Sequence, residues 1–389
     1  MRTLLLTILL AGLLTGCGQA VLPGDAQPEQ YLPLLKERKV AVYSNHTGIV
    51  DGRHLVDILL ENGIQVSAIF SPEHGFRGKA DAGAGVSDSV DPETGVPILS
   101  LYGPGGDIHP SAEAMASFDV LVVDIQDVGL RFYTYYITLC HLLDACGESG
   151  KEVVILDRPN PNGHYVDGPI LDPALKSGVG HLPIPVVHGL TLGELARMAQ
   201  GEKWLSEAGN TCPLTVIPCK NYTHQTIYNL PVAPSPNLPN MQSVYLYPSL
   251  CPFEGTVVSL GRGTDKPFQQ YGHPALQAKY SYSFTPESRP GALNPPLKGQ
   301  VCFGVDLSQL ENARTIGLDL SYVIDAYTGL KEQGQEQDFF SPFFDKLLGV
   351  TWVREMIEKG CGADIIRARW LPEVEAFKQL RKKYLLYEE

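Results

Sequence analysis

Residues 120–125 read VLVVDI, a stretch that is apolar at every position except Asp124. Such a run is typical of a parallel strand that helices cover on both faces. A helical segment, Tyr133–Cys146, follows it, and after a break at Gly147–Gly150 a second apolar run occupies Val153–Leu156. A strand, a helix and a further strand in this order predict a βαβ unit.

The same alternation continues on both sides of this unit. Val40–Ser44 and Val66–Phe70 are short β-rich runs, and His54–Leu60 between them carries apolar residues at helical spacing. A later helix is expected to begin after Thr191 as its N-cap, with Glu194 three residues on. We therefore predict an α/β fold with a doubly wound, mainly parallel sheet.

The C-terminal part has a different pattern. Residues 231–263 are dense in Pro and Asn and predict a long irregular connection over the sheet edge. Residues 280–299 are rich in Pro, Ser and Gly, so we place a boundary there, between domains at 39–280 and 281–389. Beyond the boundary we expect one strand and three helices, at residues 301–307, 318–330, 351–359 and 372–387.

The N-terminus has the pattern of an export signal. Arg2 precedes an apolar run, Leu4–Leu14, which ends in Leu-Thr-Gly-Cys at Cys17. We expect a signal peptide over residues 1–17, lipidation of Cys17, and a tether over residues 18–38. No later run is apolar enough to cross a membrane, so the chain is expected to be lipid-anchored in the cell envelope. Gly18 after the cysteine favours the outer membrane in a host that has one.

Composition narrows the function. The formal net charge of −13 argues against a nucleic-acid partner, although a locally basic pocket for a small anionic substrate remains compatible with it. Seven cysteines follow Cys17 with no CxxC pair, and the ten histidines form no HExxH or HxH motif. We expect no metal and no cofactor. The sequence does not decide whether Cys212 forms a disulfide with Cys219 or Cys251.

The candidate site residues follow the expected strands. In open α/β sheets, ligands bind outside the carboxyl ends of the strands. The polar side chains at these positions are Asn45, Glu73, His74, Asp124, Asp127, Arg131, Tyr133, Asp157, Arg158, Asn160 and His188.

Three acids are the candidate catalytic groups. Glu73, on a turn after a strand, either holds a proton for a leaving group or caps backbone N–H groups. Asp124 lies at the end of an apolar strand and needs a partner such as Arg131 or a loop N–H. Such structural pairing would by itself explain a buried carboxylate at this position. Asp127 lies further into the loop and is freer to face a substrate. Two carboxyl groups across a bond are the usual equipment for glycoside hydrolysis.

The other candidates would bind the substrate. Arg131, Arg158 and Arg262 each suit an anionic group, and Tyr133 suits the face of a sugar, although loop tyrosines often cover the core. Residues 157–161, after the fourth strand, would also form a rigid turn by their Asp, Asn and Pro content alone. A lone histidine such as His188 is more often a buried, hydrogen-bonded residue than a ligand-binding one. The glycine-lined loop at 255–263 lacks the Lys-Ser/Thr ending of a phosphate loop, but brings Arg262 close to a ligand.

Several motifs together resemble the exo-β-N-acetylmuramidase NamZ family. They are FSPEHGFRG (70–78), DIQDVGLRFYTY (124–135), LDRPNPNG (156–163), VDGP (166–169), PVVHGLTLGELA (185–196), PSPNLP (234–239) and EGTVVSLGRGTDKPF (254–268). The resemblance implies release of N-acetylmuramic acid from the non-reducing end of peptidoglycan fragments. It also implies a Rossmann-like domain, a smaller C-terminal α+β domain, and a site between them.

The resemblance places the acidic motif position on Glu73, beside His74. Its other polar positions fall on Asp124, Asp127, Arg131, Tyr133, Asp157, Arg158, Asn160, His188, Glu254, Arg262 and Thr264. Asp167 stands where many relatives have Glu, so we leave it outside the catalytic pair. The lactyl carboxylate of muramic acid calls for an arginine, Arg131 or Arg262. The alternative function is a non-catalytic envelope lipoprotein that binds muropeptides or sugars.

Overall fold

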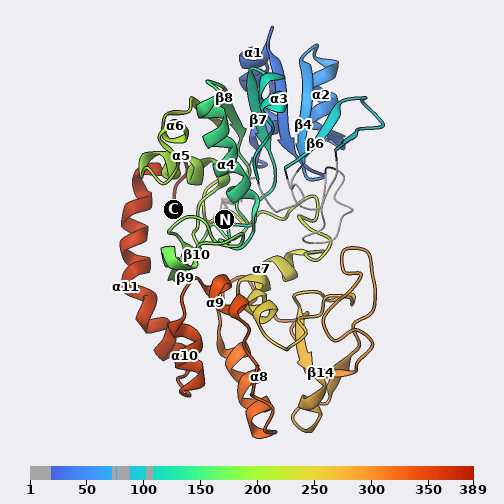
Figure 1. Cartoon of the computed structure of the whole chain (residues 1–389), viewed down its shortest axis with the longest axis vertical. Coiled ribbons are helices and arrows are strands. Elements are labelled where there is room, and N and C mark those ends of the chain that lie inside the picture. The colour runs from blue at the N-terminus through green and yellow to red at the C-terminus, as the bar shows by residue number, and fades with distance from the viewer. Residues whose placement is uncertain (1–18, 72–75, 77–87, 102–107) are drawn as a thin grey trace, which may run out of the picture.

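The structure is a computed structural model that describes residues 19–71, 76, 88–101 and 108–389 (Figure 1). Cys17, Glu73 and His74 therefore lie outside the described residues. The described chain has a sheet-containing N-terminal part and a smaller C-terminal part, and the long helix α11 (Ala363–Arg381) runs along the side of both (Figure 1).

The N-terminal part is built on a seven-stranded sheet with the order β11-β8-β7-β1-β4-β6-β5. All neighbouring strands are parallel except β5 and β6, which pair antiparallel, so the predicted fold is confirmed. The strands are β1 (Lys39–Ser44), β4 (Gln65–Ser71), β5 (Ser89–Val90), β6 (Pro97–Ser100), β7 (Val120–Asp124), β8 (Glu152–Leu156) and β11 (Leu214–Ile217).

Each face of this sheet has its own hydrophobic core because alternate side chains of a strand point to opposite faces. In β7, Val120 and Val122 join one core, while Leu121 and Val123 join the other. Helices α1 and α2 cover the first face, and α3, α4 and α5 cover the second. The helices of this part are α1 (Pro28–Leu35), α2 (Leu55–Glu61), α3 (Ala112–Ala116), α4 (Tyr135–Glu148), α5 (Leu192–Gly201) and α6 (Glu207–Thr211).

The predicted N-cap of α5 is confirmed. The Thr191 side chain accepts a hydrogen bond from the Glu194 backbone N–H, and the Glu194 carboxylate accepts one from the Thr191 N–H. This reciprocal capping box satisfies donors that a helix start leaves unpaired. It fixes the beginning of α5 at the carboxyl edge of the sheet.

The expected tether is instead folded over much of its length. Residues Gly24–Ala26 form a short 3-10 helix (η1), and α1 follows it directly. Tyr31 and Leu35 of α1 are fully buried against the sheet. Apolar side chains at helical spacing thus hold this segment on the body, where a polar tether would stay in solvent.

The C-terminal part contains a three-stranded antiparallel sheet with the order β12-β14-β13. The boundary expected at residue 280 would separate β12 from β14, its hydrogen-bonded partner. The strands are β12 (Gln270–His273), β13 (Tyr282–Phe284) and β14 (Cys302–Asp306), and the helices before α11 are α8 (Ser321–Glu332), α9 (Pro342–Leu348) and α10 (Trp352–Glu358). Helix α9 was not predicted.

Two proline-containing segments are more helical than expected. Helix α7 (Met241–Leu250) lies inside the stretch that we predicted to be irregular, and Asn240 begins it with a capping box. Helix α11 begins at Ala363 and contains Pro372, which we took as its start. In both cases a capped or well-packed helix tolerates an internal proline that sequence alone marks as a boundary.

Short elements complete the chain. An antiparallel pair, β9 (Asp167–Ile170) and β10 (Pro185–Val187), lies beside α11 (Figure 1). The remaining ones are β2 (Ile49–Val50), β3 (Arg53–His54), η2 (Pro173–Leu175), η3 (Cys251–Gly255), η4 (Pro274–Ala278) and η5 (Lys382–Tyr384).

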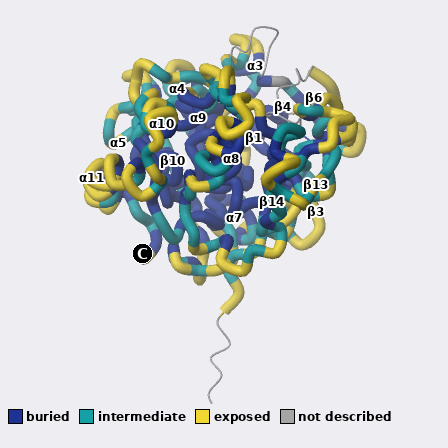
Figure 2. Tube along the Cα trace, turned by 90° about the horizontal axis from the view of Figure 1, so that it is seen from below, coloured by how far each residue is buried: buried dark blue, intermediate teal, exposed yellow. Residues whose placement is uncertain are grey.

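The buried residues form a continuous centre beneath exposed loops (Figure 2). The seven cysteines in the described part are all free thiols, so the disulfide left open from Cys212 is not formed there. Cys140 and Cys146 are buried in α4, as predicted. Among the described helices, none has the length and hydropathy needed to span a bilayer.

Candidate active site

A cavity of about 580 Å³ lies between the N-terminal and C-terminal parts. Its volume is that of a small-molecule site. Its walls come from the segment that follows β7, from Val179, from the stretch just before α7 and from the C-terminal part. Aromatic rings line much of it, together with a few polar side chains: Phe132, Tyr133, Tyr135, Tyr247, Phe253, Phe268, Ser235, Asn237, Glu254 and Arg262. An apolar cavity with a few polar groups suits a sugar with charged or acylated substituents.

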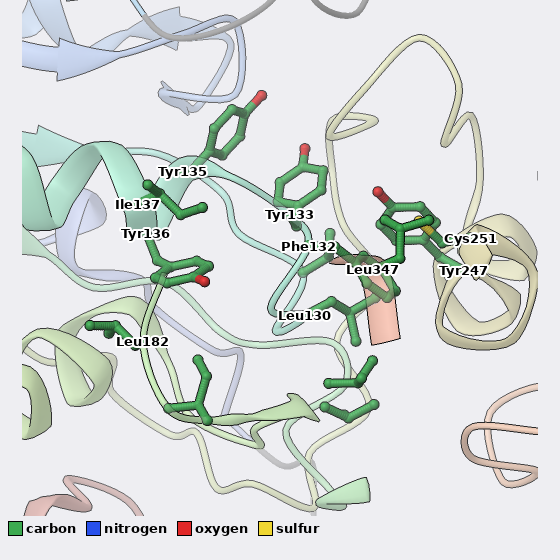
Figure 3. Close-up of a cluster of buried hydrophobic side chains, with 14 of the residues drawn as sticks. Leu130, Phe132, Tyr133, Tyr135, Tyr136, Ile137, Leu182, Tyr247, Cys251 and Leu347 are labelled. Carbon is green, nitrogen blue, oxygen red and sulfur yellow. The ribbon is translucent and has the colours of Figure 1, made fainter. Parts of the chain in front are cut away.

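Tyr133 forms the central part of the aromatic wall. Its ring lies between Tyr135, at a centroid distance of 4.7 Å, and Tyr247, at 6.2 Å (Figure 3). Its hydroxyl donates a hydrogen bond of 2.8 Å to the Pro234 carbonyl. The Asn45 side-chain amide donates to the Tyr135 hydroxyl over 2.9 Å, so Asn45 supports the wall from behind.

Arg262 and Glu254 form an ion pair at the cavity. The Arg262 Nε and Nη2 atoms lie 2.7 and 2.6 Å from Glu254 Oε1, and the guanidinium covers the Phe268 ring at 5.0 Å. Both side chains are partly exposed, by 18% and 23%. Burial lowers the pKa of Arg262, but Glu254, Tyr247 and Cys251 together raise it further, so the net shift is upward. Since the contacts to Glu254 use Nε and Nη2, the Nη1 edge is available to an anion.

Thr264 serves the turn that carries Arg262. Its hydroxyl donates to the Gly261 carbonyl over 2.6 Å and accepts from the Gln270 side-chain amide over 2.7 Å. Gly261 and Gly263 have φ angles of 86° and 78°, a conformation that favours glycine. Thr264 therefore shapes the loop and is not among the residues that line the cavity.

Asp127 is a buried acid close to Tyr133, although it is not among the residues that line the cavity. Its Oδ1 accepts a hydrogen bond of 2.7 Å from the Gly129 N–H, while its Oδ2 is buried without a partner among the described residues. Burial raises the pKa of Asp127 to about 7, against weaker lowering by the N–H groups of Gly129 and Val128. Burial and the neighbouring Tyr135, with a smaller share from Asp127, raise the pKa of Tyr133, so Asp127 and Tyr133 are close neighbours.

Asp124 has a different environment. It is fully buried, and its Oδ1 accepts from Arg158 Nε over 2.6 Å. Arg158 also forms an ion pair with Asp25 through Nη2. The partner of Asp124 is thus Arg158, where we had named Arg131, and this pair lies at the end of β7 and β8. Burial and then Asp124 raise the pKa of Asp25 to about 7, while Arg158 lowers it.

Both carboxylate oxygens of Asp157 accept hydrogen bonds within the protein. Its Oδ1 accepts from the Gly193 N–H over 2.9 Å, and its Oδ2 accepts from the hydroxyls of Thr191 and Tyr387 over 2.7 and 2.6 Å. Burial raises the pKa of Asp157 to about 6, and the Tyr387 and Thr191 hydroxyls oppose this. Asp157 therefore ties α5 and the C-terminal end of the chain to β8.

Asn160 and His188 are also engaged within the protein. The Asn160 amide donates to the Leu190 carbonyl over 2.8 Å, and its Oδ1 accepts from the Asn162 N–H over 2.8 Å. His188 Nδ1 accepts from the Leu190 N–H over 3.2 Å. Burial and the charge of Arg381 lower the pKa of His188 to about 3, so this ring is neutral.

Arg131 lies in the core. Its guanidinium donates to the carbonyls of Pro169, Ile184 and Leu347 over 2.7, 2.8 and 3.1 Å. Burial lowers the pKa of Arg131 to about 10. The structure does not bring Arg131 to the cavity, which leaves Arg262 as the candidate arginine that borders it.

Asp167, which we left outside the catalytic pair, is a buried contact of α11. Its Oδ1 accepts from Trp370 Nε1 over 2.9 Å, and its Oδ2 lies 2.8 Å from Arg367 Nη2. Within the described ranges, no group of three or more His, Cys, Asp or Glu side chains is arranged to hold a metal ion.

The sequence analysis missed two residues at the cavity and one at the carboxyl edge of the sheet. Tyr247 lies on α7, inside the segment expected to be irregular, and its ring closes the aromatic wall. Asn237 lines the cavity, and its side-chain amide donates to the Gly291 carbonyl over 2.8 Å. It belongs to the PSPNLP motif, so the motif was the sequence signal for it. Asp25 lies in the expected tether, where nothing in the sequence pattern marked it.

Comparison with known families assigns the chain. The model of the N-terminal domain of the exo-β-N-acetylmuramidase NamZ matches residues 40–242, and the model of its C-terminal domain matches residues 245–387. The chain belongs to the NamZ family. The two NamZ domains thus meet between residues 242 and 245, which keeps β12 and β14 in one domain.

Relatives of this NamZ-family chain include one curated enzyme and two solved structures. The peptidoglycan β-N-acetylmuramidase NamZ of Bacillus subtilis (strain 168) is 37% identical over 387 residues, covering 93% of this chain and 90% of the relative. A DUF1343 family protein of Bacteroides fragilis NCTC 9343 is 57% identical, with a TM-score of 0.88 over 95% of this chain and 100% of that chain. A second one from the same strain is 28% identical, with a TM-score of 0.78 over 95% and 99%.

Proposed function

We propose that this chain is an exo-acting glycoside hydrolase that releases N-acetylmuramic acid from the non-reducing end of peptidoglycan fragments. Membership of the NamZ family supports the reaction class. The observation that carries the proposal is the aromatic cavity with a cation at its wall and an acid of raised pKa next to Tyr133. A sugar with a carboxylate substituent matches these features.

Arg262 is the residue that we assign to the lactyl carboxylate. Glu254 and Phe268 hold its guanidinium in one orientation, and the Nη1 edge is left for an anion. A guanidinium held in place binds a carboxylate with less loss of side-chain entropy than a free one. Arg262 would therefore distinguish muramic acid from glucosamine, which lacks the lactyl group.

Asp127 and Glu73 are the carboxyl pair that we assign to the chemistry. Glu73 donates the proton to the glycosidic oxygen, and Asp127, once ionised, acts as base or nucleophile on the other face of the sugar. The Oδ2 of Asp127 is buried without a hydrogen-bond partner among the described residues, so this role requires the loop to expose it to the substrate. The ion pair with Arg158 argues against Asp124 as the second acid.

We also propose that the chain is anchored in the cell envelope through a lipid on Cys17. The Leu-Thr-Gly-Cys sequence after an apolar run supports this. Incorporation of radiolabelled palmitate into the wild type, and its loss in Cys17→Ser, would test the anchor. Equal labelling of both would contradict it.

The function is tested with a defined disaccharide, N-acetylmuramyl-β-1,4-N-acetylglucosamine, and mass spectrometry of the products. The wild type should release free N-acetylmuramic acid, and Glu73→Gln should release none while retaining the thermal stability of the wild type. Glu311→Gln, which neutralises an exposed acid far along the chain, is the matched control and should be fully active. Stoichiometric binding of the disaccharide by the wild type without any product would contradict the proposal.

A further inference from the structure

The N-terminal segment is closely packed against the carboxyl edge of the sheet. Leu22 pairs with Lys220 by two backbone hydrogen bonds of 3.0 and 2.8 Å. The Gly24 N–H donates to the Asp157 carbonyl over 2.7 Å. A Cβ atom on Gly24 would lie 2.6 Å from both the Asp157 nitrogen and the Ile217 oxygen, so only glycine fits here. The segment thus packs onto the ends of β8 and β11, which stay hydrogen-bonded to each other through the Asp157 N–H and the Ile217 carbonyl over 3.0 Å.

This packing brings a carboxylate to a buried cation. Asp25 is 2% exposed and forms an ion pair with Arg158 Nη2, and the Nε of the same arginine lies 2.6 Å from Asp124 Oδ1. Two acids therefore flank one guanidinium that is itself buried. Removal of either acid would leave a buried donor without an acceptor, which is unfavourable.

The ion cluster lies close to the place where this kind of fold binds ligands. The strand order reverses between β1 and β7, and open α/β sheets bind ligands at the carboxyl ends of the strands at such a point. Asp124 ends β7, and Arg158 follows β8. Here the anion beside Arg158 is supplied by the chain itself, from its own N-terminal segment.

The same cluster is continuous with the loop that carries Asp127. That loop directly follows Asp124, and its Gln126 side chain donates to the Pro159 carbonyl over 2.8 Å, one residue after Arg158. A second link runs between the same two loops, from the Asn162 amide to the Val128 carbonyl over 2.9 Å. Displacement of Arg158 would therefore be transmitted to both sides of Asp127.

We propose that Asp25 is a positioning residue for the reaction. As a built-in anion, it fixes Arg158 and Asp124 and thereby the loop that presents Asp127, and its removal creates a site for a small carboxylate such as formate. The kinetic part of this inference rests on the proposed function. The binding part does not, because it concerns only the buried guanidinium.

The experiment compares wild type, Asp25→Ala and Glu29→Ala, each with sodium formate or with sodium chloride at equal ionic strength. Glu29 belongs to the same segment and forms an exposed ion pair with Lys220, so its variant is the matched control. At a temperature where all three are folded, Asp25→Ala should lose about tenfold to hundredfold in kcat with little change in KM. Formate, and not chloride, should restore part of the loss and raise the Tm of Asp25→Ala alone.

Several outcomes would overturn the proposal. They are an unchanged kcat in Asp25→Ala, an equal loss in Glu29→Ala, or an effect of formate that chloride reproduces. If Asp25→Ala does not fold, Asp25→Asn keeps the shape and removes the charge, and it should show the same loss of kcat. If the wild type releases no muramic acid, the proposed function fails, and the formate-dependent rise in Tm still decides whether Asp25 fills an anion site.

Discussion

The carboxyl edge of the sheet and the cavity between the two parts contain the same kinds of side chain, but in different states. At the edge, Asp157 accepts three hydrogen bonds and Arg158 lies between two acids. At the cavity, Arg262 contacts Glu254 through Nε and Nη2 alone, and Asp127, which lies close to Tyr133, has a buried Oδ2 without a partner among the described residues. Polar residues after strands thus divide into those that hold the fold and those that remain available to a substrate.

The largest effect is expected from Asp127→Asn. The substitution preserves the shape of the side chain but removes the base, so kcat should fall by about 10³-fold. Because burial disfavours the charged carboxylate, the variant should be no less stable than the wild type. Steady-state kinetics with the disaccharide and a thermal melt measure both. If the variant retained more than a tenth of the wild-type activity, Asp127 would count among the residues that hold the fold.

Arg131→Met should affect stability far more than binding. The change leaves the carbonyls of Pro169, Ile184 and Leu347 without their donor, and we expect a loss of about 3 kcal/mol in the free energy of unfolding. Urea unfolding gives that value. If Arg131→Met were as stable as the wild type and bound substrate more weakly, Arg131 would belong with the cavity.

Arg262→Gln should affect substrate binding far more than stability. Its side chain is partly exposed and its loop is held by Thr264, so stability should change little. Loss of a charge-assisted hydrogen bond to the lactyl group should raise the KM for the disaccharide by about tenfold to hundredfold. An unchanged KM would remove Arg262 from the substrate-binding group.

Asp127 should also make the stability of the chain depend on pH. The pKa of Asp127 in the folded chain is about 7, above its ordinary value near 4. The folded state therefore binds this proton more tightly, and its contribution to stability is lost as the pH rises from about 4 to about 7. Asp127→Asn should gain stability relative to the wild type at pH 8 compared with pH 5. As an ionised base, Asp127 should also make kcat/KM rise with pH through about 7.

The sequence alone predicted the sheet and its two covered faces, because the apolar runs such as residues 120–124 directly reflect burial on both sides. It also predicted the capping box of α5. The sequence analysis missed the folding of residues 24–35. This short amphipathic segment contains prolines and glycine, a composition that is also typical of a tether. Helix α7 was missed for a similar reason, since Pro248 lies inside a helix that Asn240 caps.

Prediction of the site was less complete. The sequence placed polar residues at the strand ends, but it does not state which of them pair with one another. The ion pair of Asp124 is with Arg158, and Arg131 binds three carbonyls that lie far away in sequence. These partners depend on contacts between distant segments, which periodicity and motif spacing do not report. Arg262 and Tyr133, which the motifs indicated as a set, both line the cavity.

The most direct measurement compares kcat/KM for N-acetylmuramyl-N-acetylglucosamine and for di-N-acetylchitobiose, which lacks the lactyl group, in the wild type and in Arg262→Gln. The wild type should release muramic acid and strongly prefer the muramyl substrate, and Arg262→Gln should lose most of that preference by losing activity toward this substrate alone. A preference that persists undiminished in Arg262→Gln would contradict the assignment of the cavity to muramic acid.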